Sequence, residues 1–193
     1  MLLLITGASG VGKSTVRELI APNLTPLVES VELAHLSPVP AVPTKVWRQQ
    51  ATETAVRRAI ELEASGRHLL LSGDPVTAAE LAAAPSTPAL ETTAVCLLDV
   101  SAQAQATRLA ARGDDPSLLP HHQALAEWMR RQAQDPLHMT HVLSDGGWEQ
   151  MRWDRLGALA SQWKTHAIDT TEMTRREVAD AIFAWCRSVL ASG

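Results

Sequence analysis

The chain has 193 residues, of which 46% are hydrophobic and 20% are charged, and its formal net charge is −4 at pH 7. This length and composition suit one α/β domain with a sizeable core. Proteins that bind nucleic acid polymers usually carry an excess of basic residues, so the net negative charge argues against that class of function. No apolar run approaches the length of a membrane span. We therefore expect a cytoplasmic protein that binds no membrane, and the sequence leaves its oligomeric state open.

A glycine-rich motif follows the first apolar segment of the chain. Residues 2–6 are apolar and of strand length, and residues 14–21 predict a helix that ends at Pro22. Between them the sequence has the pattern G-x-x-x-x-G-K-[ST] of a phosphate-binding loop. The predicted nucleotide-binding residues are Gly7, Ala8, Ser9, Gly10, Val11, Gly12, Lys13, Ser14 and Thr15.

This motif predicts a specific chemistry. Its glycines allow backbone N–H groups to point inward at phosphate oxygens, and the helix that follows adds its positive N-terminal end. Lys13 would reach the β- and γ-phosphates, and the Ser14 hydroxyl would ligate Mg²⁺. The alternative is a glycine-rich turn with no ligand.

Strands and helices alternate along the rest of the chain. Thr44 is the expected cap of the longest helix, and Cys96 and Cys186 fall in apolar segments where they suit a core better than a redox or metal pair. The predicted strands span 27–33, 68–72, 93–100 and 164–169, and the predicted helices span 44–65, 76–84, 101–112, 118–134, 149–163 and 174–190, with loops at 35–43, 85–92 and 136–148.

This alternation predicts a mostly parallel sheet of five strands that helices cover on both faces, an α/β fold. In such sheets ligands bind beyond the carboxyl ends of the strands. By this rule, we expect one edge of the sheet to carry the glycine-rich motif, His35, residues 72–74 and residues 170–173.

Three segments together resemble the small P-loop kinases, the nucleoside monophosphate, shikimate and gluconate kinase group of the P-loop NTPase superfamily. They are the early loop at 7–14, the strand and arginine stretch Val-Cys-Leu-Leu-Asp…Arg-Leu-Ala-Ala-Arg at 95–112, and Ala-Ile-Asp-Thr at 167–170. The resemblance implies a single domain over 1–193 with the three-layer P-loop NTPase fold, a helical lid at about 108–135 and an acceptor-side region at about 34–66. It also implies ATP and Mg²⁺ as cofactors, with Thr170 in the loop that packs on adenine.

The sequence departs from these families on the acceptor side. The acidic cluster that gluconate kinases carry after their second strand is missing, and Ser72-Gly73-Asp74 stands where shikimate kinases have three glycines. These departures leave the small-molecule acceptor open between a sugar acid, a nucleoside or nucleotide, and a secondary metabolite.

Arg108, Arg112 and Asp74 are the candidate catalytic residues beside Lys13. The two arginines lie four residues apart on one helix face and would neutralise the charge that develops during phosphoryl transfer; the alternative is a solvated helix face. Asp74 follows an apolar strand and could hold Mg²⁺ through water or accept a proton from the acceptor hydroxyl; the alternative is a turn residue before Pro75.

Glu32, His35 and Arg48 are the candidate acceptor-binding residues. Glu32 and His35 follow the second strand, and Arg48 lies near the start of the long helix, where it could bind an anionic acceptor. Solvent-facing edge positions and ordinary helix charge are the alternatives. The tryptophans at 128, 148 and 153 could form the floor of an acceptor pocket, although core packing is the commoner role.

Three classes of function remain. An ATP-dependent kinase that phosphorylates a small metabolite fits the three segments best. A nucleotide-hydrolysing switch or motor fits less well, because Asn23 is the only asparagine, so no Asn-Lys-x-Asp stretch exists, and no apolar run ends in Asp-Glu. A nucleotide-binding regulatory protein without an acceptor is the third, and the intact Lys13-Ser14 pair speaks against it.

Overall fold

Five parallel strands form one sheet in the order β2-β3-β1-β4-β5. The computed structural model describes residues 1–73 and 75–192. The register pairs Leu3 with Leu70 on one side of β1 and Ile5 with Cys96 on the other. The strands are β1 (Leu2–Thr6), β2 (Val28–Glu32), β3 (His68–Ser72), β4 (Thr93–Asp99) and β5 (His166–Asp169). The prediction of a five-stranded parallel sheet is confirmed.

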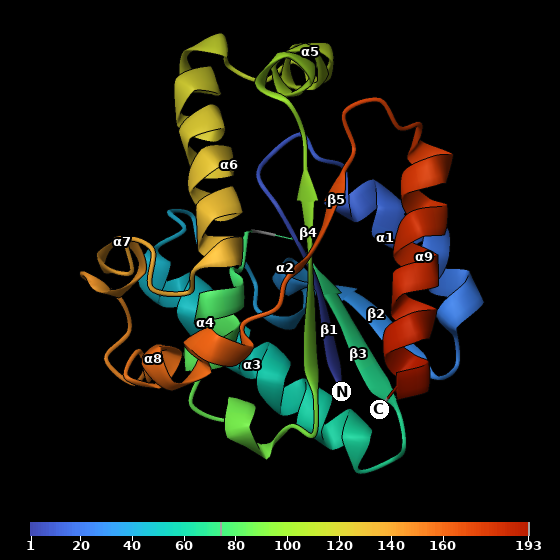
Figure 1. Cartoon of the computed structure of the whole chain (residues 1–193), viewed down its shortest axis with the longest axis vertical. Helices are drawn as coiled ribbons and strands as arrows, with labels where there is room; N and C mark the ends of the chain where they lie inside the picture. Colours follow the sequence, from blue (N-terminus) through green and yellow to red (C-terminus); the bar gives the residue numbers. More distant parts are fainter. Residues whose placement is uncertain (74, 193) are drawn as a thin grey trace.

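Helices cover both faces of this sheet (Figure 1). The helices α1 and α9 pack on one face, and α3, α4 and α6 lie over the other. The helices of the described residues are α1 (Lys13–Leu24), α2 (Leu33–Leu36), α3 (Lys45–Glu63), α4 (Ala78–Ala83), α5 (Ala102–Arg112), α6 (Leu119–Gln134), α7 (His141–Ser144), α8 (Arg155–Leu159) and α9 (Arg175–Ser192), with short 3₁₀ turns at Thr87–Ala89, Pro116–Leu118 and Ala160–Gln162.

The central strand is apolar throughout because both of its faces are buried. Leu3 and Ile5 face the core under α1 and α9, whereas Leu2 and Leu4 face the core under α3. Cys186 and Cys96 lie in the first of these cores, as predicted, and burial raises the pKa of the Cys186 thiol to about 12. Such thiols are protonated at neutral pH and act as small apolar residues.

The first helix continues past the point where the sequence predicted its end. Pro22 lies inside α1, which runs to Leu24. Proline removes only one N–H donor, and the last turn is still closed because the Thr25 amide donates to the Ala21 carbonyl at 3.3 Å. Burial of Leu24 in the core under α9 favours the longer helix.

The segment 149–163 differs most from its prediction of one helix. Only α8 and a 3₁₀ turn form there, because backbone contacts to the end of α4 hold the preceding residues in another conformation. The Arg152 amide donates to the Ala83 carbonyl at 2.7 Å, and the Arg155 guanidinium donates to the Ala84 carbonyl at 3.0 Å. Short helices also replace parts of two predicted irregular segments, α2 after the second strand and α7 within 136–148.

The carboxyl ends of the strands share one end of the molecule with the glycine-rich loop and α5 (Figure 1). The described chain termini lie at the opposite end. Among the described residues, none of the helices has both the length and the apolar character needed to cross a membrane.

Candidate functional site

The loop at 7–12 has a backbone shape that requires glycine. Gly7, Gly10 and Gly12 have φ values of 144°, 87° and 95°. A Cβ at Gly7 would lie 2.3 Å from the carbonyl oxygen of Leu98, so the loop passes directly against the end of β4. Gly12 is the N-cap of α1, and no side chain accepts a hydrogen bond there. The first turn of α1 is therefore open to an anion.

Lys13 lies across the mouth of this loop. Its ammonium group donates to the carbonyl of Gly7 at 2.7 Å and to that of Ala8 at 3.1 Å. Ser14 and Thr15 follow it on the exposed side of α1. The ammonium group and the helix N-terminus thus lie on either side of the same loop.

The described residues could supply one ligand to a Mg²⁺ ion that is also held by nucleotide phosphates. No group of three or more His, Cys, Asp or Glu residues that could hold a metal forms within 1–73 and 75–192. The exposed hydroxyl of Ser14 remains as a ligand that could share the ion with phosphate oxygens. Asp74, the other predicted metal-shell residue, lies outside the described residues.

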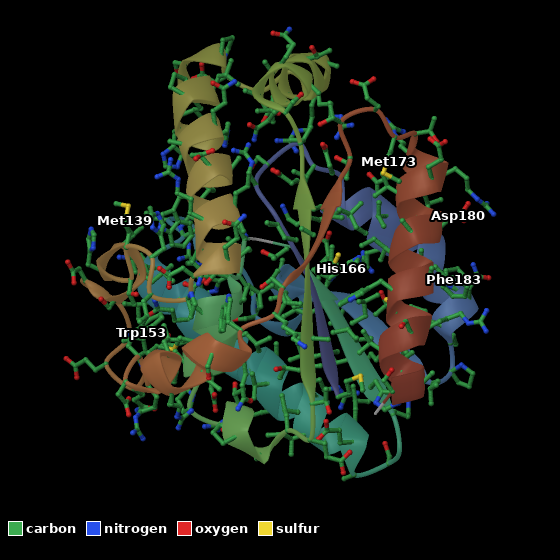
Figure 2. All side chains as sticks on the ribbon, viewed as in Figure 1. Met139, Trp153, His166, Met173, Asp180 and Phe183 are labelled. Atoms are coloured by element: carbon green, nitrogen blue, oxygen red, sulfur yellow. The ribbon has the colours of Figure 1, made fainter. Side chains whose placement is uncertain are left out.

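A cavity of about 550 Å³ opens beside the loop. This volume lies in the range of nucleotide and cofactor sites. The lining comes from the loop and α1, from α5, and from the start of α9, where Met173 lies (Figure 2). The lining residues are Gly10, Val11, Gly12, Thr15, Val16, Arg108, Ala111, Arg112, Met173, Thr174, Arg175 and Val178. The structure thus brings both predicted arginines to the cavity that the loop borders.

Arg108 ties α5 to the loop after β5. Its guanidinium donates to the Thr170 hydroxyl at 2.9 Å and to the Thr170 carbonyl at 2.5 Å. Thr170 is fully buried, and its hydroxyl donates to the Asp99 carbonyl at 2.9 Å. The buried Thr170 therefore stabilises the loop after β5, whereas residues 173–175 line the cavity.

Arg112 extends from the last turn of α5 and is paired with Asp114. Its Nε donates to a carboxylate oxygen of Asp114 at 2.6 Å, and its Nη2 donates to the other oxygen. These hydrogen bonds raise the pKa of Arg112 and lower the pKa of Asp114. Both charges are therefore present at neutral pH, and a phosphate that binds Arg112 must compete with Asp114.

Replacement of Asp114 by asparagine is expected to lower the Kd of inorganic triphosphate about two- to fivefold, the range for one exposed ion pair. The amide removes the competing charge and leaves Arg112 in place. Asp154→Asn is the matched control, because Arg152 and Asp154 form the same two-bonded pair, at 2.9 and 2.8 Å, away from the cavity. Isothermal titration calorimetry with inorganic triphosphate checks this, and an unchanged or higher Kd for Asp114→Asn would contradict it.

The residues predicted for the acceptor side lie beyond the ends of β2 and β3. Glu32 ends β2, and a Cβ at Gly73 would lie 3.8 Å from the Glu32 Cβ and 3.1 Å from the Leu33 amide nitrogen. The ends of the two strands are therefore adjacent. His35 lies exposed on α2, next to the same edge.

Arg48 is engaged inside the protein. Its Nε and Nη2 donate to one carboxylate oxygen of Glu80 at 2.9 and 2.7 Å, and Glu80 is fully buried. The other oxygen of Glu80 accepts from the Thr77 amide at 3.1 Å and caps α4. The structure thus gives Arg48 a structural role that the sequence did not predict.

The tryptophans of the predicted acceptor floor lie partly in cores. Trp128 and Trp153 pack against the core of Ala79, Leu143 and Leu156.

Several residues that line the cavity were not predicted from the sequence, namely Ala111, Thr174, Arg175 and Val178. Arg175 has no hydrogen-bond or ion-pair partner among the residues that the structure describes, and its position just after the last strand and turn was the available signal.

Comparison with known proteins identifies the fold. No protein-family model matches the sequence, and no curated protein matches it. A sugar kinase from Janibacter sp. HTCC2649 has a similar structure, with a TM-score of 0.59 and 15% sequence identity over 98% of this chain and 96% of that one. A gluconokinase from Sinorhizobium meliloti 1021 is similar with a TM-score of 0.55 and 18% identity over 98% and 93% of the two chains. The chain therefore has the fold of the small P-loop kinases.

Proposed function

We propose that this protein, whose fold is that of the small P-loop kinases, is an ATP-dependent phosphotransferase that acts on a hydroxyl or phosphate group of a small metabolite. One observation carries the proposal: the cavity beside the phosphate-binding loop is lined jointly by that loop, by two arginines of α5 and by the start of α9. A nucleotide in this cavity would direct its phosphates toward Lys13 and the N-terminus of α1.

Phosphoryl transfer requires positioning and charge neutralisation more than covalent catalysis. Lys13 would bind the β- and γ-phosphates, Arg112 would neutralise charge from the lid side, and Arg108 would position the base-binding loop through Thr170. Ser14 and phosphate oxygens would hold Mg²⁺, which supplies further neutralisation of the phosphate charge when bound. We retain Asp74 as the proposed proton acceptor on its place in the sequence after β3.

In transfer to a hydroxyl acceptor, one bond to phosphorus forms and another breaks. The hydroxyl oxygen forms a bond to the γ-phosphorus, and the bond from that phosphorus to the oxygen shared with the β-phosphate breaks. ADP leaves with this electron pair. The hydroxyl proton passes to Asp74 and then to solvent. Glu32 and His35, at the adjacent strand end, are proposed to contact the acceptor.

ADP release in the presence of Mg²⁺ tests the proposal. The purified protein is mixed with ATP alone and with ATP plus pooled sugar acids, nucleosides, nucleoside monophosphates, or neutral and amine-bearing alcohols. We expect at least one pool to raise ADP release well above the rate with ATP alone. A high rate that is indifferent to every pool would indicate an ATPase, and nucleotide binding with no turnover in any pool would indicate a regulatory protein.

A further inference from the structure

We infer that the acceptor is a hydroxyl compound that carries no negative charge. This inference rests on the proposed phosphotransferase function and names the substrate class of the same site. It follows from the distribution of charge around the strand ends, where arginines line the nucleotide cavity and the half-buried carboxylate of Glu32 lies at the acceptor edge.

The lysine and arginine side chains of the acceptor side already have partners in the protein. The Lys45 ammonium donates to the Asp145 carbonyl at 2.6 Å. Between residues 33 and 80, leaving out residue 74, and on α6, each lysine and arginine has a hydrogen-bond partner: Lys45, Arg48, Arg57, Arg58, Arg67, Arg130 and Arg131. To bind one of these side chains, a carboxylate or phosphate on the acceptor would have to compete with the partner that the side chain already has.

Arg48 is the cation nearest to an acceptor role, and it cannot leave its partner without loss. Its side chain is 22% exposed, whereas the Glu80 side chain is 0% exposed. If Arg48 turned to a substrate anion, the Glu80 carboxylate would remain buried with only the Thr77 donors. A buried charge that loses its counter-ion is strongly destabilising, so the fold opposes this exchange.

The acceptor edge carries a carboxylate that has no partner among the described residues. Glu32 is half-buried at the end of β2, beside Gly73, and its carboxylate has no hydrogen-bond or ion-pair partner within the described part of the chain. A carboxylate in this position accepts hydrogen bonds from hydroxyl or ammonium groups and repels anions. Glu32 therefore selects against sugar acids and nucleoside monophosphates.

The nucleotide end of the site has the opposite character. Arg108, Arg112 and Arg175 line the cavity there, and Lys13 lies against the loop that borders it. These four side chains thus place positive charge at the end of the site where the triphosphate of a nucleotide would bind. An anionic acceptor would have to share these groups with ATP.

Matched acceptors that differ in one charge test the inference. The protein is assayed for ADP release with ATP, Mg²⁺ and either 3-phenyllactate or 3-phenyllactamide, and then with D-gluconate, AMP, 3-phenylpropane-1,2-diol and N-benzylethanolamine. We expect turnover with non-anionic alcohols and, within the matched pair, at least about tenfold higher kcat/KM for the amide. Turnover only with the anionic compounds would overturn the inference but leave the phosphotransferase proposal standing, whereas no acceptor-dependent turnover would contradict both.

A charge reversal at Glu32 tests whether this residue sets the preference for non-anionic acceptors. Glu32→Arg is expected to shift the ratio of kcat/KM for 3-phenyllactate over 3-phenyllactamide by about tenfold or more toward the acid. Glu18→Arg is the matched control, because Glu18 is exposed on α1 and lies outside the acceptor side. Both variants are checked for an unchanged melting temperature. An unchanged ratio in a folded Glu32→Arg protein would overturn the role of Glu32.

Discussion

Lys13→Ala is expected to lower phosphate transfer by at least about 10²–10³-fold, to the limit of detection in most assays. The Lys13 ammonium already lies at the mouth of the loop, where it donates to the carbonyls of Gly7 and Ala8. A bound triphosphate would receive this charge where negative charge concentrates, and no other side chain of the loop supplies one. Steady-state ADP release with the best acceptor measures the effect.

Lys164→Ala is the matched control for this experiment. Lys164 lines a separate, smaller cavity beside α4 and β4, so the same deletion of an ammonium group there is expected to leave kcat unchanged. Circular dichroism should give the same melting profile for both variants. Normal turnover in folded Lys13→Ala protein would contradict the proposed mechanism.

Arg48→Ala is expected to lower the free energy of unfolding by about 3–5 kcal/mol, because it leaves the buried Glu80 carboxylate without its counter-ion. Urea denaturation at pH 7 measures this change. The double variant Arg48→Ala, Glu80→Gln should regain part of the loss, since a neutral amide is less costly to bury than an unpaired charge. Arg131→Ala is the control, because Arg131 and Glu127 form an exposed pair on α6 that contributes little to stability.

The same variant separates two roles for Arg48. If Arg48→Ala unfolds at unchanged urea concentration but raises the KM for an anionic acceptor, Arg48 binds the acceptor as its sequence position suggested. That result would also contradict the inferred non-anionic acceptor. The structure predicts the reverse, a large loss of stability and no selective effect on anionic compounds.

Features encoded by local sequence were predictable. The backbone of the phosphate-binding loop depends on glycines at set positions, so eight consecutive residues were sufficient to place it. The Thr44 hydroxyl caps α3 by accepting from the Trp47 amide at 3.1 Å, as its position before a helical segment indicated. The strand at 68–72 was also predicted with its observed bounds, because an apolar run between two glycines leaves little choice.

Features set by distant contacts were not predictable. Arg48 and Glu80 are 32 residues apart and meet only because α3 packs against α4. The segment 149–163 has residues that suit a helix, but hydrogen bonds to the end of α4 interrupt it. Likewise, the cavity role of Arg175 depends on how α9 begins beside α5, which no local pattern specifies. Tertiary packing overrides local propensity in each of these cases.

The fate of the γ-phosphate distinguishes a phosphotransferase from a nucleotide-hydrolysing protein. ATP labelled in its γ-phosphate is incubated with the protein, Mg²⁺ and an acceptor that raises ADP release, and the products are separated. We expect the label to move to the acceptor in an amount equal to the ADP formed, and Lys13→Ala to prevent this transfer. Label recovered as inorganic phosphate, with none on the acceptor, would contradict the proposed function and identify a nucleotide-hydrolysing protein.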